Sequence, residues 1–286
     1  MSDTPYYLHM PAERSSCAVF SSPHSGADYP QDFLTASRLT LLQLRSSEDA
    51  FVDELFAAAP RNGAPLIAAR MPRACVDLNR ARDDLDPALI AGAERRSINP
   101  RVVAGLGVIP RVVAEGRAII PGKLSMAEAE QRITRWWQPY HVRLLSLMRE
   151  SLAVSGAAIL IDCHSMPRDA LLNAPLVGGR RPEVILGDRF GASCDRWLIE
   201  AAAEFFGDAG FAVARNVPFA GGHITQAYGA PRRGVHALQI EIDRGLYMDE
   251  ARIGRLPEFN EVAARISEAC AQLARLEPRS MAVAAE

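Results

Sequence analysis

Three short polar segments of the chain each follow or close an apolar run, and each carries a side chain that can bind a metal ion or move a proton. They are Ser22–Gly26 with His24, Asp162–Ser165 with His164, and Gln239–Asp243 with Glu241. In an open α/β sheet, ligands bind beyond the carboxyl ends of the strands. Two imidazoles and a carboxylate at one sheet edge would make the metal site of a hydrolase.

His164 is the more informative of the two histidines, because Asp162 precedes it at the end of an apolar run. A partner that orients the imidazole is typical of metal-binding histidines. His24 lies in a turn, where a histidine that only bonds the backbone is the alternative. Strict alternation places Glu241 on one strand face with two other polar residues, and a solvated face is the alternative for them.

A third protein ligand is needed, since catalytic zinc takes three and keeps one position for water. Glu48 and Asp49 are the nearest acidic candidates, at the start of a helix expected over Ser47–Ala59. The alternative is that these acids only offset the helix dipole. The spacing leaves open which of the two would bind.

Arg73 and Arg80 flank a short apolar run, Cys75–Leu78, which we expect to be a strand. Two arginines and Asn79 suit planar, bidentate recognition of a carboxylate. We expect Asp77 to hold one of the arginines in place. A surface ion-pair group is the alternative.

A turn with paired glycines, Gly221–Gly222, allows the backbone to approach a ligand closely and makes His223 a further candidate. A plain turn histidine is the alternative. His141 lies beside aromatic residues in an expected helix and is interpreted as a packing residue. The sequence has no dinucleotide, phosphate-loop or nucleophile-elbow motif, which weakens the corresponding classes of function.

The elements that must position these residues alternate between strands and helices, which predicts a largely parallel sheet covered on both faces. Ser125 and Glu128 form a capping box that opens a long helix ending at Gly156, and Pro139 should kink it or divide it in two. We expect one domain over residues 1–286, with a long insertion at about 81–122 and a flexible tail from Arg279.

The composition, 49% hydrophobic and 23% charged, is that of an ordinary globular protein. A net charge of −2 gives no electrostatic case for nucleic acid or a membrane surface as partner. The only lysine is Lys123, which removes Schiff-base chemistry from consideration. Five scattered cysteines, no signal peptide and no long apolar run lead us to expect a cytoplasmic protein.

Seven segments, in family order over roughly residues 17–250, resemble the N-formylglutamate amidohydrolase family. The matching residues are Pro23-His24-Ser25-Gly26, Asp49-x-x-Val52-Asp53, Arg73-x-x-x-Asp77-Leu78-Asn79-Arg80, Trp137-x-Pro139-Tyr140-His141, Asp162-Cys163-His164-Ser165, Gly221-Gly222-His223-Ile224-Thr225 and Gln239-Ile240-Glu241. This family is similar to the zinc carboxypeptidase and aspartoacylase group. The resemblance implies a three-layer, phosphorylase/hydrolase-like α/β fold, with a mostly parallel or mixed central sheet.

The resemblance also implies roles for individual residues. One Zn²⁺ per chain, or another divalent metal, would be held by two histidines and an acid, for which the family alignment favours Asp49 over Glu48. Glu241 would be the general base. The roles implied in substrate binding are carbonyl polarisation by Arg73, carboxylate binding by Asn79 and Arg80, and a substrate contact by His223.

Some positions depart from the related families. The carboxypeptidase group takes its acidic ligand three residues after the first histidine, where this chain has Ala27. Ser47 stands where family members often have aspartate, and His223 stands where tyrosine is common. These changes keep the chemistry and leave the substrate open.

We therefore expect a zinc-dependent amidohydrolase whose partner is a small acidic N-acyl amino acid. With the family substrate, N-formyl-L-glutamate, the products would be formate and glutamate, a reaction of histidine degradation. The alternatives are a deacylase or peptidase of the same zinc group with another substrate, or a non-catalytic small-molecule-binding relative. The retention of Glu241 and both histidines argues against the last. The sequence leaves the oligomeric state open.

Overall fold

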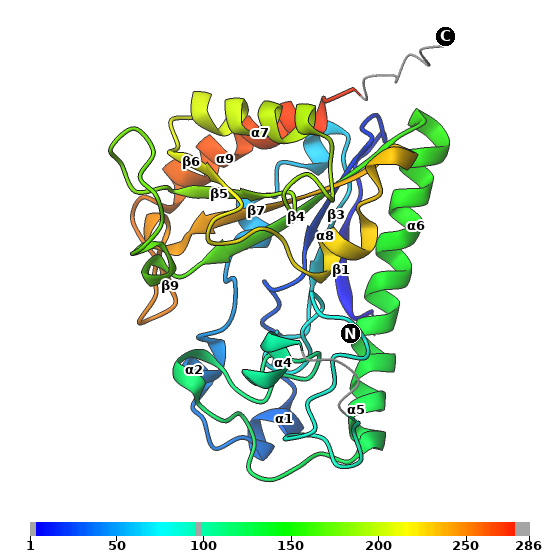
Figure 1. Cartoon of the computed structure of the whole chain (residues 1–286), viewed down its shortest axis with the longest axis vertical. Coiled ribbons are helices and arrows are strands. Elements are labelled where there is room, and N and C mark those ends of the chain that lie inside the picture. Colours follow the sequence, from blue (N-terminus) through cyan, green and yellow to red (C-terminus); the bar gives the residue numbers. More distant parts are fainter. Residues whose placement is uncertain (1–3, 95–98, 278–286) are drawn as a thin grey trace.

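A seven-stranded mixed sheet forms the centre of the computed structural model, which describes residues 4–94 and 99–277 (Figure 1). Its strands are β1 (Tyr6–His9), β2 (Ala18–Ser22), β3 (Leu66–Ala69), β4 (Ala158–Met166), β5 (Val184–Gly187), β6 (Val213–Arg215) and β7 (Val235–Asp243). Their order is β1-β3-β2-β4-β7-β5-β6. The central strands β3, β2, β4 and β7 are parallel, whereas β1 and β5 run antiparallel to their inner neighbours.

Helices cover both faces of this sheet, which confirms the predicted fold class (Figure 1). They are α1 (Gln31–Ala36), α2 (Leu41–Arg45), α3 (Val52–Leu55), α4 (Pro100–Val103), α5 (Met126–Arg132), α6 (Gln138–Ser155), α7 (Arg196–Asp208), α8 (His223–Tyr228) and α9 (Phe259–Ala274). Two short strands, β8 (Met248–Asp249) and β9 (Gly254–Arg255), form a separate hairpin. No helix in the described part of the chain is long and apolar enough to span a membrane.

Alternation along β4 decides which side of the sheet carries the polar residues. Ile159 and Ile161 pack on the face covered by α3, α7 and α9, and Leu160 packs on the opposite face with α6. Because successive side chains point to opposite faces, Asp162 and His164 continue the α6 face beyond the apolar core. The candidate site therefore lies at the carboxyl ends of parallel strands, on the side of α6 and α8.

The long helix on this face begins and ends as the sequence predicts. Ser125 accepts a hydrogen bond from the Glu128 amide and completes the capping box, and Gly156 ends the helix with φ 70°. The helix continues through Pro139: α5 passes into a π-helical turn, Ile133–Trp137, and this turn passes into α6, which starts one residue before the proline.

Two predicted elements are wrong, and both lie beside the candidate site. Cys75–Leu78 is an irregular turn rather than a strand, because the Cys75 amide donates to Pro72 and the Asp77 amide donates to Val108, neither in a strand ladder. The helix expected over Ser47–Ala59 is reduced to α3, because Phe51 has a left-handed backbone with φ 67°. In both cases tertiary contacts override the local pattern.

The described residues of the segment 81–122 lie beyond the sheet, where α4 is seen in the lower part of Figure 1 together with α1 and α2. They form mostly turns, and an isolated bridge joins Ile90 to Leu124, just after the segment. Its residues 104–116 contribute part of the wall of the cavity described below. The tail predicted from Arg279 lies outside the described residues.

Candidate active site

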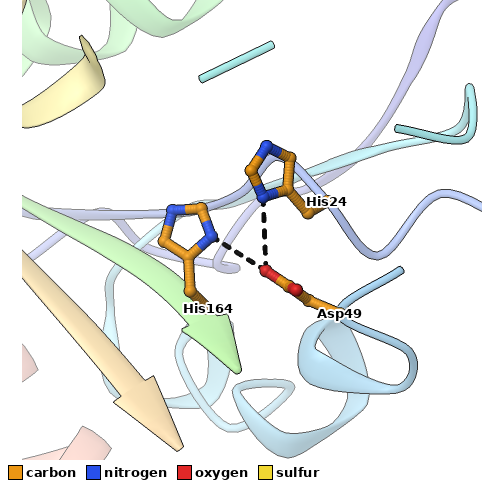
Figure 2. Close-up of side chains that lie close together, drawn as sticks. All are labelled: His24, Asp49 and His164. Atoms are coloured by element: carbon orange, nitrogen blue, oxygen red, sulfur yellow. Dashed lines mark hydrogen bonds and ion pairs between the residues drawn. The ribbon is translucent and has the colours of Figure 1, made fainter. Parts of the chain in front are cut away.

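Three buried side chains converge where β2 and β4 end (Figure 2). His24 follows β2, His164 lies near the end of β4, and Asp49 comes from the loop before α3. Asp49 Oδ2 lies 3.3 Å from His24 Nδ1 and 2.9 Å from His164 Nδ1. One atom from each residue lies within 4.8 Å of the others. The structure thus brings together the three residues predicted as metal ligands.

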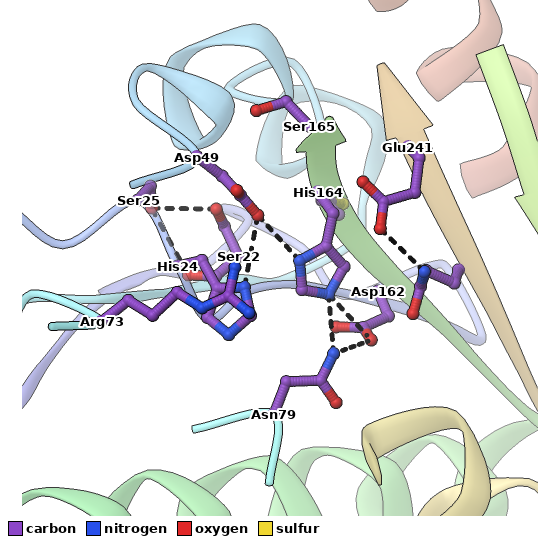
Figure 3. A network of polar contacts seen from close by, with 12 residues as sticks. Ser22, His24, Ser25, Asp49, Arg73, Asn79, Asp162, His164, Ser165 and Glu241 are labelled. Atoms are coloured by element: carbon purple, nitrogen blue, oxygen red, sulfur yellow. Dashed lines mark hydrogen bonds and ion pairs between the residues drawn. The ribbon is translucent and has the colours of Figure 1, made fainter. Parts of the chain in front are cut away.

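The far nitrogen of each imidazole has its own carboxylate partner, and Figure 3 shows the partner of His164, which is Asp162. His24 Nε2 donates to Asp77 Oδ1 at 2.7 Å, and His164 Nε2 lies 3.1 Å from Asp162 Oδ2. An imidazole that carries its proton on Nε2 presents a lone pair at Nδ1. In that tautomer the two Nδ1 atoms and Asp49 Oδ2 are three ligand atoms for one cation. Two imidazoles held by carboxylates and one carboxylate fit a divalent metal ion.

Asp49, rather than its neighbour Glu48, faces the histidines. The buried Glu48 carboxylate instead accepts a hydrogen bond from the Tyr29 hydroxyl at 2.6 Å and pairs with Arg45 at 3.0 Å. Asp49 is held from outside the pair as well, because Arg244 Nη2 donates to its Oδ1 at 2.8 Å. The two oxygens of the Asp49 carboxylate thus have different partners.

The charges around Asp49 favour its ionised form. Burial by itself would raise the pKa of Asp49, but hydrogen bonds from the two histidines, with the Arg244 charge, hold it well below the usual value. Burial likewise disfavours the charged form of His164, yet the Asp162 and Asp49 carboxylates raise its pKa well above the usual value. The pocket is therefore built to hold positive charge between these side chains.

A third carboxylate, Asp77, joins the histidine pair to the arginine segment. Besides His24, it accepts the Asn79 backbone amide at 2.8 Å and Arg73 Nε at 3.0 Å. Arg73 and His24 hold the pKa of Asp77 well below its usual value despite burial. The expectation that Asp77 holds an arginine in place is confirmed, and the same carboxylate also orients His24.

Helix α6 and the π-helical turn before it fix the backbone of the segment from Arg73 to Arg80. Trp137 Nε1 donates to the Arg80 carbonyl at 2.9 Å, and His141 Nε2 donates to the Leu78 carbonyl at 2.9 Å. His141 is buried and lies against Trp137, with ring centroids 4.0 Å apart, so its interpretation as a packing residue is confirmed. These contacts replace the ladder bonds that a strand would have supplied.

Asn79 lies between Asp162, the partner of His164, and helix α8, and its side-chain amide forms hydrogen bonds to both. Its Nδ2 donates to Asp162 Oδ2 at 3.3 Å, and its Oδ1 accepts the Ile224 amide at 2.7 Å. A Cβ at Gly222 would lie 2.5 Å from Asn79 Nδ2, so this position requires glycine. The close approach predicted for the glycine turn is thus an approach to Asn79.

A cavity of about 470 Å³ opens over these residues. Glu241, on β7 beside His164 of β4, lies in its wall and accepts a hydrogen bond from Gln239 Nε2 at 2.9 Å. Burial, with the nearby Asp49 carboxylate, raises the pKa of Glu241 to about 7, against opposing effects of His164 and Arg73. A carboxylate with such a pKa can accept a proton at neutral pH.

The polar wall of this cavity contains four arginines and the three carboxylates of Asp49, Glu115 and Glu241. The arginines that line it, among the described residues, are Arg73, Arg80, Arg101 and Arg244. Arg80 Nε donates to the Leu106 carbonyl at 2.8 Å, and the Asp77 carboxylate lies 4.0 Å from it. His223, predicted as a substrate contact, is not in the cavity wall. It is the first residue of α8 and packs near Trp137, with ring centroids 6.3 Å apart.

Sequence reasoning missed Arg244 and the contact between Asp77 and His24. Arg244 directly follows β7, so the rule that singled out His24 after β2 would also have singled out this arginine. The Asp77–His24 contact joins residues 53 positions apart through an irregular turn, and no local pattern indicates it.

Comparisons with known proteins agree with this architecture. The family model of N-formylglutamate amidohydrolase matches residues 16–248. The chain is 32% identical over 241 residues to the N-formylglutamate deformylase of Pseudomonas putida, covering 81% of this chain and 82% of that protein. The enzyme of the same name from Pseudomonas aeruginosa is 32% identical over 240 residues, with the same coverage.

A solved structure extends the agreement to the fold. The crystal structure of N-formylglutamate amidohydrolase from Ralstonia eutropha JMP134 has a TM-score of 0.88 and 33% identity, and the match covers 95% of this chain and 97% of that one. The gene product Atu2144 of Agrobacterium tumefaciens, at 20% identity and a TM-score of 0.66, shares the fold. Fold, site and matches define an enzyme of the amidohydrolase class. The chain belongs to the N-formylglutamate amidohydrolase family.

Proposed function

We propose that this protein is a zinc-dependent amidohydrolase that converts N-formyl-L-glutamate to formate and glutamate. The observation that carries the proposal is the convergence of His24 Nδ1, His164 Nδ1 and Asp49 Oδ2 in a cavity that also contains Glu241 and Arg73. The substrate is taken from the names of the relatives in Pseudomonas and Ralstonia, which the chain matches over most of its length.

A divalent metal ion held by His24, Asp49 and His164 would supply Lewis acidity for attack on an amide carbonyl. Zinc is the metal proposed, because two imidazoles and one carboxylate are the ligand set of several catalytic zinc sites. With the metal bound, Asp77 and Asp162 would accept the Nε2 protons of the two histidines and hold the rings in place, which leaves each Nδ1 to the metal.

The remaining side chains of the cavity divide the chemistry between them. Glu241 takes a proton from the attacking water and then gives a proton to the nitrogen of the leaving amine. Arg73, fixed by Asp77, donates to the carbonyl oxygen as negative charge develops on it. The water oxygen ends in formate, and the broken C–N bond leaves the amino group of glutamate.

Recognition of an acidic substrate rests on the arginines of the cavity wall. We propose that Arg80 binds a substrate carboxylate, because a planar guanidinium presents paired donors. Asn79 orients this segment through its bonds to Ile224 and Asp162. We further propose that the enzyme acts in amino-acid metabolism, in histidine degradation, and in the cytoplasm. The last point is supported by five buried, unpaired cysteines.

The test is a hydrolysis assay with zinc-loaded protein on N-formyl, N-acetyl and N-succinyl derivatives of glutamate and of neutral amino acids. We expect formate release from N-formyl-L-glutamate, its loss after chelation and its recovery with Zn²⁺. The His24→Ala and His164→Ala variants should not retain zinc. Faster hydrolysis of an N-acetyl or N-succinyl derivative would show that the substrate is not N-formyl-L-glutamate. Absence of any hydrolysis would refute the proposed function.

A further inference from the structure

We propose that Arg244 is a positioning residue that keeps Asp49 a metal ligand through one oxygen only. The inference rests on the proposed metal site. Arg244 is 5% exposed and directly follows β7, the strand that carries Glu241. Its Nη2 donates to Asp49 Oδ1 at 2.8 Å, while the other oxygen of that carboxylate faces both histidines.

The same edge of the guanidinium is also held by a second residue, so its position does not depend on Asp49 alone. Arg244 Nε donates to Ser165 Oγ at 3.2 Å, and Ser165 directly follows His164 on β4. One side chain therefore ties the Asp49 carboxylate to the strand that carries a histidine ligand. Such a fork needs the planar geometry of arginine.

Asp49 needs this support because, unlike the strand residue His164, it comes from an irregular loop. The Asp49 amide donates to the His24 carbonyl at 3.0 Å, and the next residue, Ala50, accepts a hydrogen bond from the Tyr247 hydroxyl at 3.0 Å. Arg244 and Tyr247 both belong to the turn that follows β7. This turn thus fixes the backbone and the side chain of the Asp49 loop together.

Occupation of Oδ1 by Arg244 has a direct chemical consequence. A free carboxylate can bind a metal ion through both oxygens, which would fill the position that a catalytic site keeps for water. The hydrogen bond from Arg244 leaves only Oδ2 for the metal. The positive charge of Arg244, however, also repels a cation. Loss of the bonds that position Asp49 weakens metal binding, whereas loss of the repulsive charge strengthens it, so the two effects of replacing Arg244 predict opposite changes in metal affinity.

The experiment measures the zinc dissociation constant of the full-length apoprotein by competition with a chromophoric chelator. For Arg244→Gln we expect the dissociation constant to rise about 10–100-fold, the usual cost of losing a partner of a metal ligand. Arg244→Lys keeps the charge but cannot bond Asp49 and Ser165 together, so its dissociation constant should also rise. Ser165→Ala should weaken binding less, in the same direction.

A second readout follows the coordination itself. In the Co²⁺-substituted protein, the visible absorption should change in Arg244→Gln, because the released Oδ1 is free to bind the metal. The matched control is Arg168→Gln, which removes an arginine beside the same turn whose side chain is 54% exposed and lies outside the cavity wall. Its zinc affinity and Co²⁺ spectrum should equal those of the wild type.

The outcomes separate the role of Arg244 from the metal site itself. Tighter zinc binding by Arg244→Gln, with Arg244→Lys unchanged, would show that charge repulsion outweighs positioning and would overturn the inference. Unchanged affinities and spectra in both variants, in a wild type that binds zinc, would overturn it as well. A wild-type protein that binds no stoichiometric zinc would refute the proposed metal site and this inference with it.

Discussion

Replacement of Asp77 by asparagine tests how much one buried carboxylate contributes to the site. Asp77 is 1% exposed and accepts three hydrogen bonds, from His24 Nε2, the Asn79 amide and Arg73 Nε. Asparagine keeps the shape but has one oxygen and one NH₂ group. Either His24 or Arg73 must then face a donor instead of an acceptor.

The cost divides between stability and metal binding. Removing one partner of a buried ion pair costs about 3–5 kcal/mol. Arg73 keeps 22% of its side chain exposed to the cavity, where water replaces part of the lost bond, so we expect the lower end, about 3 kcal/mol. A domain with an unfolding free energy of ~5–15 kcal/mol remains folded after such a loss. Zinc affinity should fall about 10–100-fold, because His24 loses the partner that orients it.

The assays are urea unfolding of the apoprotein and chelator competition for zinc. Asp86→Asn is the matched control, because Asp86 is also buried and accepts Arg111 Nε at 2.8 Å, outside the cavity wall. This variant should lose stability but bind zinc as the wild type does. If Asp77→Asn also binds zinc with wild-type affinity, Asp77 does not act through His24, and the account of the tautomer is wrong.

Three further predictions concern the base, the carboxylate contact and acid stability. Glu241→Gln should lower kcat about 10²–10⁴-fold with zinc content intact, and near wild-type turnover would contradict its role as the base. Arg80→Lys should reduce kcat/KM about 10–100-fold for N-formylglutamate and less for the monoamide that lacks the bound carboxylate; equal loss for the substrate and both monoamides would exclude a direct ion pair. Burial lowers the pKa of His141 to about 3, whereas the pKa in the unfolded chain is ~6.5. Between these two pH values only the unfolded chain binds the proton, so the free energy of unfolding decreases as the pH is lowered. His141→Gln should remove about 2 kcal/mol of the loss between pH 6.5 and 4.5, measured by urea unfolding at both pH values, and an unchanged pH dependence would contradict burial of the neutral ring.

Much of the sheet follows from the sequence because its central strands are short apolar runs closed by polar residues. The apolar runs before His24 and His164 form β2 and β4. The edge strand β1 was not predicted, since its residues alternate only between half-buried and exposed positions. Period and burial therefore predict the interior of the sheet better than its edge.

The predictions fail where the chain serves the site. Cys75–Leu78 has the composition of a strand but is fixed as a turn by α6, and Phe51 breaks a helix next to Asp49. Local preference is overruled there because the backbone must present Asp77 to His24 and Asp49 to both histidines. Conflict between local pattern and structure is thus concentrated at the functional residues.

At this site the sequence predicts the metal ligands better than the residues that hold those ligands in place. The pattern of apolar runs predicts where parallel strands end, and His24 and His164 are predicted as site residues because they lie at such ends. The partner of each ligand's second polar atom comes from a distant part of the sequence. Arg244 and Asp49 are 195 positions apart, and Asp77 and His24 are 53 positions apart. Those contacts decide the tautomer of a histidine and the number of carboxylate oxygens left for a metal ion. The chemistry of the ligand set therefore becomes specific only once the fold has brought these partners together.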